Sequence, residues 1–574
     1  MGSYDLALIH VPSVYDFRER IFAPGPISEV VPSLYVFDMI PYGFLTLLTY
    51  LERRGFRVGI FNLAAKMLLD RSFDVPRFLK KLEADVYGID LHWLVQAHGA
   101  LEIARMVKEL HPNSLVMLGG ISASYYWQEI MSSWPTVDAV VRGDTAELPM
   151  EKLLKMLETG EKALNGVENL VWRDQSRVRE NSFSYFPTEM DKFEVDHRLF
   201  FKHLLRTRDL GLSAPFASFL ESPIGSVLTV KGCCFECETC GGSRSAYKRF
   251  MGREVLALKS SRAIASEMAS IAELARIPIF ILGDIMIGGM KRAKQIIREL
   301  RKLDLENDLM FEFFNPVGRQ LLTELRSLGD NVYLQISPES PLEDLRNAFG
   351  RSYTNEQLER MVRNALRLDF KRLDLYFMTG LPKQTPENAA LVSDYLEHLY
   401  GKFDLKGGLD AFTAPLAPFL DPGSKAFERP SDFGYSLMFS TLKDHRKALL
   451  EPHWRFTLNY ETMWMTREEI TSASRSAALS LAEAKAKLGI TDQERVEIIR
   501  NRVTFDAKAE KIAESVRAKG AGVGALERLR TELQELVGKK ELELKRELYP
   551  SHRLIGSLRL KGLMRALLKI YLGI

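Results

Sequence analysis

The feature that most constrains this 574-residue chain is the position of its cysteines, because all four lie within one eight-residue window. They are Cys233, Cys234, Cys237 and Cys240. A disulfide framework spreads its cysteines to cross-link distant segments, and thiols this close together cannot close a useful loop. We therefore expect a reduced chain in which the cysteines form a metal site.

The spacing of the thiols indicates which metal group they hold. Structural zinc usually takes two cysteine pairs separated by a dozen or more residues, and this window has no second pair. Cys233-x3-Cys237-x2-Cys240 offers three thiolates on one tight loop, which suits three corners of a [4Fe–4S] cube and leaves the fourth iron open. Cys234 creates a competing x2-x2 register. A non-enzymatic scaffold with structural zinc remains an alternative, which the iron content of the anaerobic protein would test.

The first 150 residues alternate strand-like and amphipathic helical segments, a pattern typical of a parallel sheet covered by helices. Phe44, Leu47, Leu48 and Leu51 form one apolar helical stripe, and the segment 103–110 carries another. The expected strands are 5–10, 57–62, 86–91, 115–118 and 139–142. Five such strands make a doubly wound domain, which binds ligands at the loops beyond the carboxyl ends of its strands. Those loops are 11–13, 91–93, 119–124 and 143–147.

A second α/β region follows a connector. Residues 151–225 are interpreted as this connector, with a helix near 150–157 and a short hairpin around 172–174. Six βα-like units within 226–428 predict a partial or full barrel, whose reactive groups would lie at the carboxyl ends of its strands. The expected strands are 227–230, 277–282, 310–314, 332–336, 372–378 and 410–414.

Residues 429–574 are expected to form a helical region that docks the substrate or caps the barrel. Glu, Lys, Arg and Ala dominate 472–548, which predicts a set of exposed helices interrupted by the glycine-rich 520–524. The segment 551–574 is amphipathic and contains no acidic residue. Such a tail packs on the body of the protein, or it binds a membrane surface or an acidic partner. Its basic residues are Arg553, Arg559, Lys561, Arg565 and Lys569.

The charge balance excludes some partners. The chain has 78 basic and 75 acidic side chains, a net charge of +3, which is too balanced for nucleic-acid binding through bulk electrostatics. It has no stretch of 18 or more apolar residues, and its first residues carry neither the basic flank nor the apolar core of a signal peptide. We expect a cytoplasmic protein with no transmembrane segment and no nucleic-acid partner.

The cysteine spacing, directly after a strand that opens a barrel-like repeat, resembles that of the radical SAM superfamily, in which S-adenosylmethionine (SAM) chelates the fourth iron. The resemblance assigns Cys233, Cys237 and Cys240 to the cluster and leaves Cys234 as a packed, unligated thiol. Members usually carry an aromatic residue immediately before the third cysteine. This chain has Thr239 there, which departs from the pattern of the adenine contact.

Other segments match the same superfamily in the expected order. Gly283-Asp284 resembles the Gly-Gly-Glu element that receives the amino group of the methionine moiety, with Asp in place of Glu. The segments 380–382 and 416–424 resemble a Gly-Leu-Pro turn and the segment that closes the barrel, and their implied roles are structural. The resemblance also implies a set of SAM contacts. For Glu312, Ser337 and Glu339 the alternative is ordinary solvation of a strand end. The full set is Phe235, Gly283, Asp284, Glu312, Ser337 and Glu339.

The N-terminal domain ahead of the barrel resembles that of the cobalamin-binding subclass. The segments 119–120 and 140–147 match its Gly-Gly and Gly-Glu signatures. A cobalamin domain with a coordinating histidine normally carries Asp-x-His-x-x-Gly after its first strand, whereas the loop 11–14 has no histidine. We expect a residue of the loop 91–93 to pack beneath cobalt, and whether His92 is a ligand stays open. The implied cobalamin contacts are Pro12, Ser13, Leu91, His92, Trp93, Gly119, Gly120, Gly143, Asp144 and Glu147.

Together the resemblances imply a cobalamin-dependent radical SAM methyltransferase that acts on an unactivated sp3 carbon. The [4Fe–4S] cluster, SAM and cobalamin would share one cavity between the two sheets, an external donor would supply electrons, and no catalytic side chain is assigned. We expect a peptide or protein substrate, methyl-coenzyme M reductase being one possibility, because the helical C-terminal region could dock a macromolecule. A lipid or small-molecule substrate and a non-methylating radical rearrangement are the alternatives.

Overall fold

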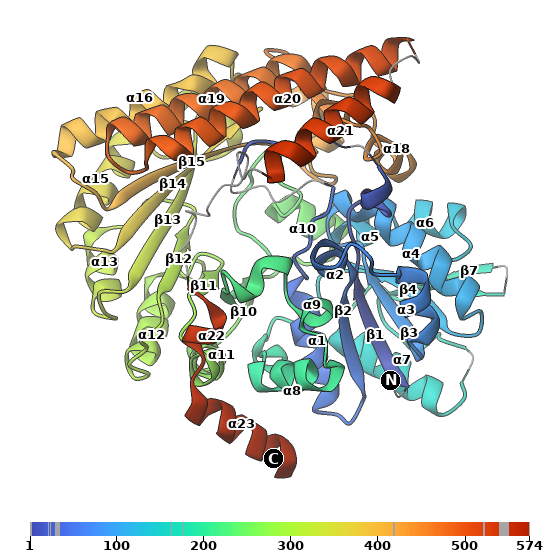
Figure 1. Cartoon of the computed structure of the whole chain (residues 1–574). Coiled ribbons are helices and arrows are strands. Elements are labelled where there is room, and N and C mark those ends of the chain that lie inside the picture. The colour runs from blue at the N-terminus through green and yellow to red at the C-terminus, as the bar shows by residue number, and fades with distance from the viewer. Residues whose placement is uncertain are drawn as a thin grey trace.

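The structure is a computed structural model in which two α/β units lie side by side, with C-terminal helices laid across one side of them (Figure 1). It describes residues 3–20, 22, 25–28, 35–161, 163–175, 177–416, 419–519, 523–538, 550 and 552–572. Parts of three segments singled out in the sequence lie outside the described residues. They are 417–418 of the barrel-closing segment, 520–522 and 539–549 of the helical region, and 551 and 573–574 of the tail.

The N-terminal unit is built on a seven-stranded sheet with the order β2-β1-β3-β4-β5-β6-β7. The first five strands are parallel, which confirms the predicted doubly wound sheet. β6 and β7 form a hairpin where one was predicted, and they extend the sheet in antiparallel register. The strands are β1 (Tyr4–His10), β2 (Val58–Asn62), β3 (Ala84–Asp90), β4 (Leu115–Gly119), β5 (Ala139–Val141), β6 (Leu170–Asp174) and β7 (Arg177–Glu180).

Helices cover both faces of this sheet, because side chains of successive strand residues point to opposite sides. Leu6 and Leu8 of β1 join the core beneath α1 (Tyr42–Glu52) and α7 (Glu147–Glu158). Ala7 and Ile9 join the core beneath α4 (Ala97–Leu110). The predicted apolar stripes face these cores, with Phe44, Leu48 and Leu51 buried on α1 and Ile103, Met106 and Val107 buried on α4.

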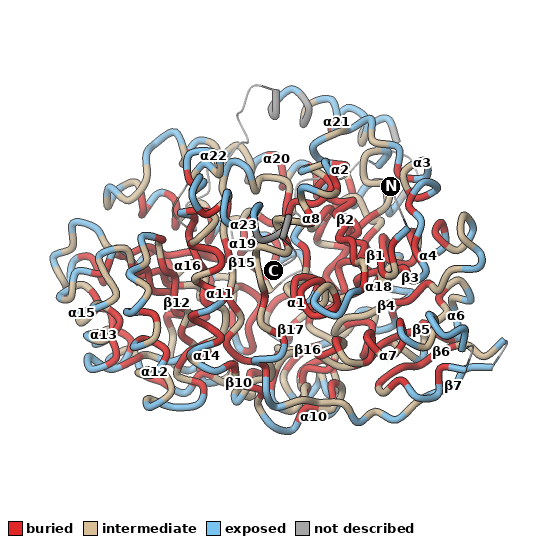
Figure 2. The backbone as a smooth tube through the Cα atoms, turned by 90° about the horizontal axis from the view of Figure 1, so that it is seen from below, coloured by how far each residue is buried: buried red, intermediate tan, exposed pale blue. Residues whose placement is uncertain are grey.

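The second unit is a partial barrel of six parallel strands with the order β15-β14-β13-β12-β11-β8, as predicted. Its strands are buried or half-buried along their length (Figure 2). They are β8 (Gly225–Leu228), β11 (Ile279–Leu282), β12 (Leu309–Phe313), β13 (Val332–Glu339), β14 (Arg372–Thr379) and β15 (Leu409–Pro415). The outer helices are α11 (Ser261–Leu274), α12 (Met290–Arg301), α13 (Arg319–Arg326), α15 (Asn355–Arg367) and α16 (Pro386–Phe403).

The prediction of exposed C-terminal helices is wrong for α19 (Arg467–Lys487). This helix packs against α16 and β15 and buries Ile470, Ala473, Ala477 and Leu481. Its many alanines present a small-residue surface that lets the neighbouring backbone approach closely, and the high content of charged residues concealed that surface in the sequence. The helices α20 (Gln493–Lys519) and α21 (Val523–Gly538) follow along the same side of the molecule (Figure 1).

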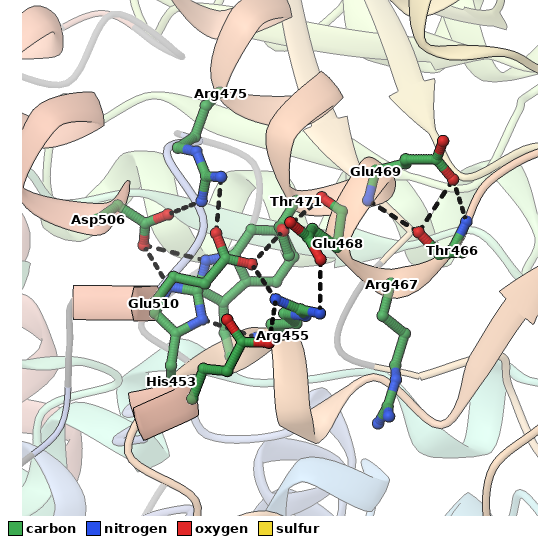
Figure 3. Close-up of polar contacts among 12 residues, drawn as sticks. His453, Arg455, Thr466, Arg467, Glu468, Glu469, Thr471, Arg475, Asp506 and Glu510 are labelled. Carbon is green, nitrogen blue, oxygen red and sulfur yellow. Dashed lines mark hydrogen bonds and ion pairs between the residues drawn. The ribbon is translucent and has the colours of Figure 1, made fainter. Parts of the chain in front are cut away.

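A buried polar network fastens α20 to α19 (Figure 3). Asp506 accepts hydrogen bonds from Arg475 Nη1 (2.9 Å) and from the His453 ring (3.2 Å). Glu510 accepts from Arg475 Nη2 (2.7 Å) and from the Thr471 hydroxyl (2.9 Å). Both carboxylates are nearly inaccessible to solvent, so removing Arg475 would leave two buried charges poorly compensated. The two helices are therefore fastened to each other by buried polar contacts, and α19 fastens them to the barrel.

The chain ends on the opposite side of the barrel. The short helix α22 (Leu554–Ser557) and the longer α23 (Leu560–Leu572) lie beside α11, and α23 projects downward in Figure 1. No helix among the described residues is both long and apolar enough to cross a bilayer.

Candidate functional site

The two sheets share one cavity of about 1190 Å³. Small-molecule pockets usually measure about 300–1,000 Å³, so this cavity has room for more than one ligand. His92 and Gly143 line it from the carboxyl ends of the N-terminal strands. Glu312 and Glu339 line it from the carboxyl ends of the barrel strands. The edges at which both folds place their ligands thus face each other.

The N-terminal wall depends on a close approach of two loops. Gly120 has φ +116°, a conformation that favours glycine, and a Cβ at this position would lie 2.4 Å from the Cα of His92. The glycine thus lets the turn after β4 press against the loop after β3. Most of the predicted cobalamin contacts share this wall. They are His92, Trp93, Gly119, Gly120, Gly143, Asp144 and Glu147.

Three predicted cobalamin contacts lie away from the cavity wall. Pro12 and Ser13 are buried against α4, where a Cβ on Gly99 would lie 1.8 Å from the carbonyl oxygen of Pro12. Ser13 accepts a hydrogen bond from the amide of Gly99 at 3.0 Å. Leu91 is fully buried in the N-terminal core. These residues are placed to support the loops of the wall from behind.

A buried polar chain shapes the loop after β3. The side-chain oxygen of Gln96 accepts the amides of His92 (3.2 Å) and Trp93 (3.0 Å), and its side-chain nitrogen donates to Asp90 (2.7 Å). Asp90 also accepts from the ring of His10 at 2.7 Å. Burial opposes the charged form of His10, but Asp90 outweighs burial and the pKa of His10 is raised. The buried hydrogen bonds among His10, Asp90 and Gln96 therefore hold the loop in one shape.

The ring of His92 is left free to meet a ligand. Burial lowers the pKa of His92 to about 4, so the imidazole is neutral at physiological pH. The ring packs edge-on against Trp93 with 4.6 Å between centroids. Among the described residues no hydrogen bond to the ring is found. Metal-ligating histidines usually donate their other N–H to a carboxylate or carbonyl, and no described residue offers His92 that partner.

The cysteine loop has the chemistry that an iron–sulfur cluster needs. Burial raises the pKa of the Cys237 thiol to about 11 and that of Cys240 further, so these thiols stay protonated unless a metal ion displaces the proton. Backbone amides donate to the sulfurs of Cys233 (3.4 Å) and Cys240 (3.3 Å), the type of contact that tunes clusters. Cys234 is exposed, which corrects the expectation of a packed thiol.

A single metal ion would need a different arrangement. Within the described part of the chain, no group of three or more His, Cys, Asp or Glu side chains is placed to hold one ion. A cubane makes a different demand, because each thiolate binds its own iron.

The cysteine loop is anchored to the barrel-closing segment, since Asp421 accepts the amide of Gly241 at 3.0 Å.

Two carboxyl groups, Asp284 just after β11 and Glu312 near the end of β12, have raised pKa values. Burial raises the pKa of Asp284 to about 6, although it accepts the amides of Met286 (2.8 Å) and Phe314 (3.1 Å). Burial raises the pKa of Glu312 to about 7, and its carboxylate accepts the amide of Gly283. Glu312 faces the cavity, whereas Gly283 and Asp284 lie behind the wall.

The sequence analysis did not identify Arg351, which lies between the cluster loop and the cavity. Its guanidinium is 3.6 Å from the carboxylate of Glu339 and stacks over Phe235 (5.4 Å) and Phe314 (4.9 Å). Burial raises the pKa of Glu339 to about 7 against the opposing effect of Arg351. Glu339 also has φ +67°, a strained conformation that is common at functional sites. Arg351 follows a helix rather than a strand, so no strand-end signal marked it.

Of the predicted SAM contacts, Glu312, Ser337 and Glu339 share the cavity wall. Phe235 lies outside that wall and reaches the site through Arg351 and an edge-on contact with Phe314 at 5.7 Å. The barrel therefore brings together the polar groups at the ends of β12 and β13 as expected.

A salt-bridge clamp joins the two units beside the cluster loop. Arg253 Nη2 donates to Asp144 at 2.8 Å, and both side chains are buried. Lys231, two residues before Cys233, donates to the backbone oxygen of Asp144 at 2.8 Å and lies 3.9 Å from Glu147. Asp144 and Glu147 were predicted to contact cobalamin, and their carboxylates face the cations of the cluster segment.

The geometry defines a two-domain cofactor enzyme, with a three-thiolate loop on a partial (β/α)6 barrel facing a doubly wound domain. Comparison with known families gives the particular class. Residues 30–153 match the B12 binding domain and residues 227–395 match the radical SAM superfamily. The chain therefore belongs to the radical SAM enzymes that carry a cobalamin-binding domain. Its cofactors are a [4Fe–4S] cluster, SAM and cobalamin.

Two curated relatives differ in chemistry. The chain is 24% identical over 339 residues to the uncharacterized methyltransferase PH0819 of Pyrococcus horikoshii, a match covering 58% of this chain and 69% of the relative. It is also 24% identical over 307 residues to the anaerobic magnesium-protoporphyrin IX monomethyl ester cyclase of Cereibacter sphaeroides. That match covers 50% of this chain and 45% of the cyclase.

A solved structure shares the fold. It is the radical SAM methyltransferase TsrM from Kitasatospora setae with cobalamin and [4Fe–4S] cluster bound, at a TM-score of 0.55 and 14% identity, covering 89% of this chain and 100% of that chain. A second structure of TsrM contains tryptophan substrate and a SAM analogue, aza-SAM. Its TM-score is 0.52 at 15% identity, covering 76% of this chain and 79% of that chain.

Proposed function

We propose that the chain transfers a methyl group from SAM, by way of cobalamin, to an unactivated sp3 carbon atom. The observation that carries the proposal is the single cavity lined by both cofactor domains, with His92 and Gly143 on one side and Glu312 and Glu339 on the other. Two cofactors that must act on one substrate carbon need this arrangement, because reacting atoms have to approach within about 3–3.5 Å.

When bound, the cofactors supply the hard chemistry. In the balanced reaction a C–H bond becomes C–CH3, one SAM yields 5′-deoxyadenosine and methionine, a second SAM yields S-adenosylhomocysteine, and an external donor supplies two electrons. The protein positions the groups and excludes water. Cys233, Cys237 and Cys240 would hold the cluster, and the carboxyl groups of Glu312 and Glu339 would bind SAM. His92 and Trp93, which line the cavity, would contact cobalamin.

An anaerobic assay of two products tests the proposal. The reconstituted, reduced protein is incubated with SAM, and 5′-deoxyadenosine and S-adenosylhomocysteine are quantified together. Equal formation of both in the presence of substrate supports radical methylation. Cys234→Ala is the matched control for Cys237→Ala, because Cys237 belongs to the proposed cluster and Cys234 does not. Loss of activity in both variants, or in neither, would contradict the assignment.

Non-methylating radical chemistry is the second candidate, and the match to a cyclase favours it. SAM carrying a CD3 group distinguishes the two functions. Methyl transfer puts the CD3 group into the product, whereas cyclisation forms 5′-deoxyadenosine without S-adenosylhomocysteine and leaves the product unlabelled.

The substrate class is a separate question. The expected peptide or protein substrate relied on a helical region free to dock a macromolecule, but α19 and α20 are engaged with the barrel and with each other. TsrM was solved with tryptophan, a small molecule. The peptide substrate stays a prediction. The apolar lining of part of the cavity also restricts which substrates can enter it.

A further inference from the structure

The cavity extends well beyond the polar groups that face the cofactors. It follows the inner face of the barrel from the carboxyl ends of the strands back past their amino ends. Along the first strand it is lined from Val230 to Ile224, a span of roughly 20 Å at about 3.3 Å per residue. Phe280 and Met310 line it from the neighbouring strands. The cavity therefore continues along the barrel beyond the strand ends that face the N-terminal domain.

The far end of the cavity is a throat made of apolar side chains. Leu205 and Leu210 are about half exposed there, at 45% and 50%, so the throat reaches the molecular surface. It lies between α8 (His197–Thr207), α9 (Leu210–Ser213) and the C-terminal helices. Its side chains are Phe201, Leu205, Leu210, Phe219, Leu554 and Leu558.

Several large apolar side chains of α23, the C-terminal helix beside this throat, face outward, whereas Leu563 lines the cavity. Gly562 and Ala566 form the docking face, and a Cβ on Gly562 would lie 1.6 Å from a carbonyl oxygen of α11. Leu560, Met564 and Leu568 are 73%, 62% and 59% exposed. A helix that packed only to bury apolar surface would point these side chains inward. The exposed apolar face is continuous with the throat through Leu558.

The tail is fixed in this orientation by its backbone. Ser557 accepts the amide of Arg276 at 2.7 Å, and Leu274 accepts the amide of Arg559 at 2.9 Å, which brings the tail alongside the segment that leads into β11. Arg553, Lys561 and Arg565 are exposed around the apolar face, and no acid occurs in 551–574. Basic residues flanking exposed leucines are the signature of a helix that lies in an anionic membrane interface.

We propose that the apolar throat admits a hydrocarbon chain of a membrane lipid and that α23 docks the protein on an anionic bilayer. This inference rests on the proposed function and names its substrate class. One leaflet of the hydrocarbon core is roughly 15 Å deep, so a cavity of roughly 20 Å accommodates most of one chain. A peptide in the throat would leave its backbone N–H and C=O groups without partners, whereas a hydrocarbon chain has none to satisfy.

Vesicle co-sedimentation of the holoprotein tests the docking surface. The protein is expected to bind phosphatidylglycerol vesicles, to bind phosphatidylcholine vesicles at least about tenfold less tightly, and to dissociate with added salt. L560E/M564E should abolish binding. Met463→Glu is the matched control, because Met463 is 79% exposed on a different part of the chain and should bind as the wild type does. Equal binding by wild type and L560E/M564E, or no binding by wild type, would overturn the proposal.

The throat is tested with a fluorescent fatty acid, cis-parinaric acid, in detergent-free buffer. Leu205→Trp narrows the mouth and should weaken binding of the probe about tenfold, because the larger ring occupies space that the hydrocarbon chain enters. Val255→Trp, at an exposed position outside the throat, should leave binding unchanged. Probe binding that is unaffected by Leu205→Trp would overturn the assignment.

These measurements need no turnover, so the inference and the proposed function fail separately. Vesicle binding without any 5′-deoxyadenosine formation retains the docking surface and rejects the function. Methyl label from SAM that appears in a peptide or protein and not in the lipid extract rejects the lipid substrate and retains the methyltransferase.

Discussion

The two ends of the cavity differ in almost every physical respect. At the cofactor end, Glu312, Glu339 and Arg351 are buried ionisable groups within reach of one another. At the far end the walls are leucine and phenylalanine side chains that open to the surface. The difference indicates that one part of the cavity suits the cofactors and that another part selects the substrate. One end is built to hold fixed cofactors, and the other is built to admit something without polar atoms.

The largest effect is expected from a substitution in the cysteine loop at the cofactor end of the cavity. Cys237→Ala should lower the iron content from about four per chain and reduce 5′-deoxyadenosine formation by more than about 10³-fold, because the lost group carries the chemistry. Iron analysis and product quantification on anaerobically reconstituted protein measure it. Cys234→Ala should retain both, and a Cys237→Ala protein with normal iron and SAM cleavage would refute the cluster assignment.

The next effect concerns the buried carboxyls. A carboxyl whose folded pKa is raised holds its proton more tightly in the folded chain, so its stabilising effect is present below its unfolded pKa and lost as pH rises through the folded value. For Glu312 this window runs from about 4.5 to about 7. The wild-type cofactor-free chain should therefore lose up to about 3 kcal/mol of stability between pH 5 and pH 8 through this group. Glu312→Gln should not show that loss.

Thermal unfolding at both pH values measures this effect. Asp330→Asn, at a side chain that is 92% exposed, is the control and should leave the pH dependence unchanged. An identical pH dependence in wild type and Glu312→Gln would show that Glu312 does not titrate in this range.

A smaller effect sharpens the comparison from the apolar end. Leu210→Asp places a charge at the half-exposed mouth of the throat and should reduce methyl label in the lipid extract about threefold, because only part of the roughly 1–3 kcal/mol penalty for burying an unpaired polar group applies there. Formation of 5′-deoxyadenosine without substrate should stay within about twofold, since the cofactor end is untouched. Equal losses of both products would mean that the two ends are not separable.

The smallest expected effect is at His92. Because no carboxylate or carbonyl of the described residues orients its ring, we expect it to pack beneath the corrin without ligating cobalt. Electron paramagnetic resonance of the Co(II) state should lack nitrogen superhyperfine splitting in the wild type and in His92→Ala. Splitting that is present in the wild type and absent in the variant would establish His92 as a ligand.

The sequence predicted the sheets well because their signals are local. Strand-length apolar runs and helical stripes such as that of Phe44, Leu48 and Leu51 depend on neighbours within a few residues. The cysteine spacing predicted the cluster loop for the same reason. The exposed helices were predicted less well, because the alanine face of α19 finds its partner α16 far away in the sequence.

Some predicted contacts near strand ends line the cavity, whereas two arginines that follow helices were not predicted. Glu312 and Glu339 end β12 and β13, whereas Arg351 and Arg253 reach the site from segments after helices. Loop residues adjacent in sequence also diverge in space, so that Leu91 is buried in the core while His92 and Trp93 line the cavity. Patterns of spacing carry no information on such non-local contacts.

The clamp between Asp144 and its partners Lys231 and Arg253 bears on how the enzyme matures. It ties the segment that carries the cysteines to the loop after β5 of the N-terminal domain, so displacement of one domain would move the cysteine loop of the other. Assembly of the active enzyme then depends on the two domains being docked, because the cysteine segment shares its buried ion pairs with the neighbouring domain.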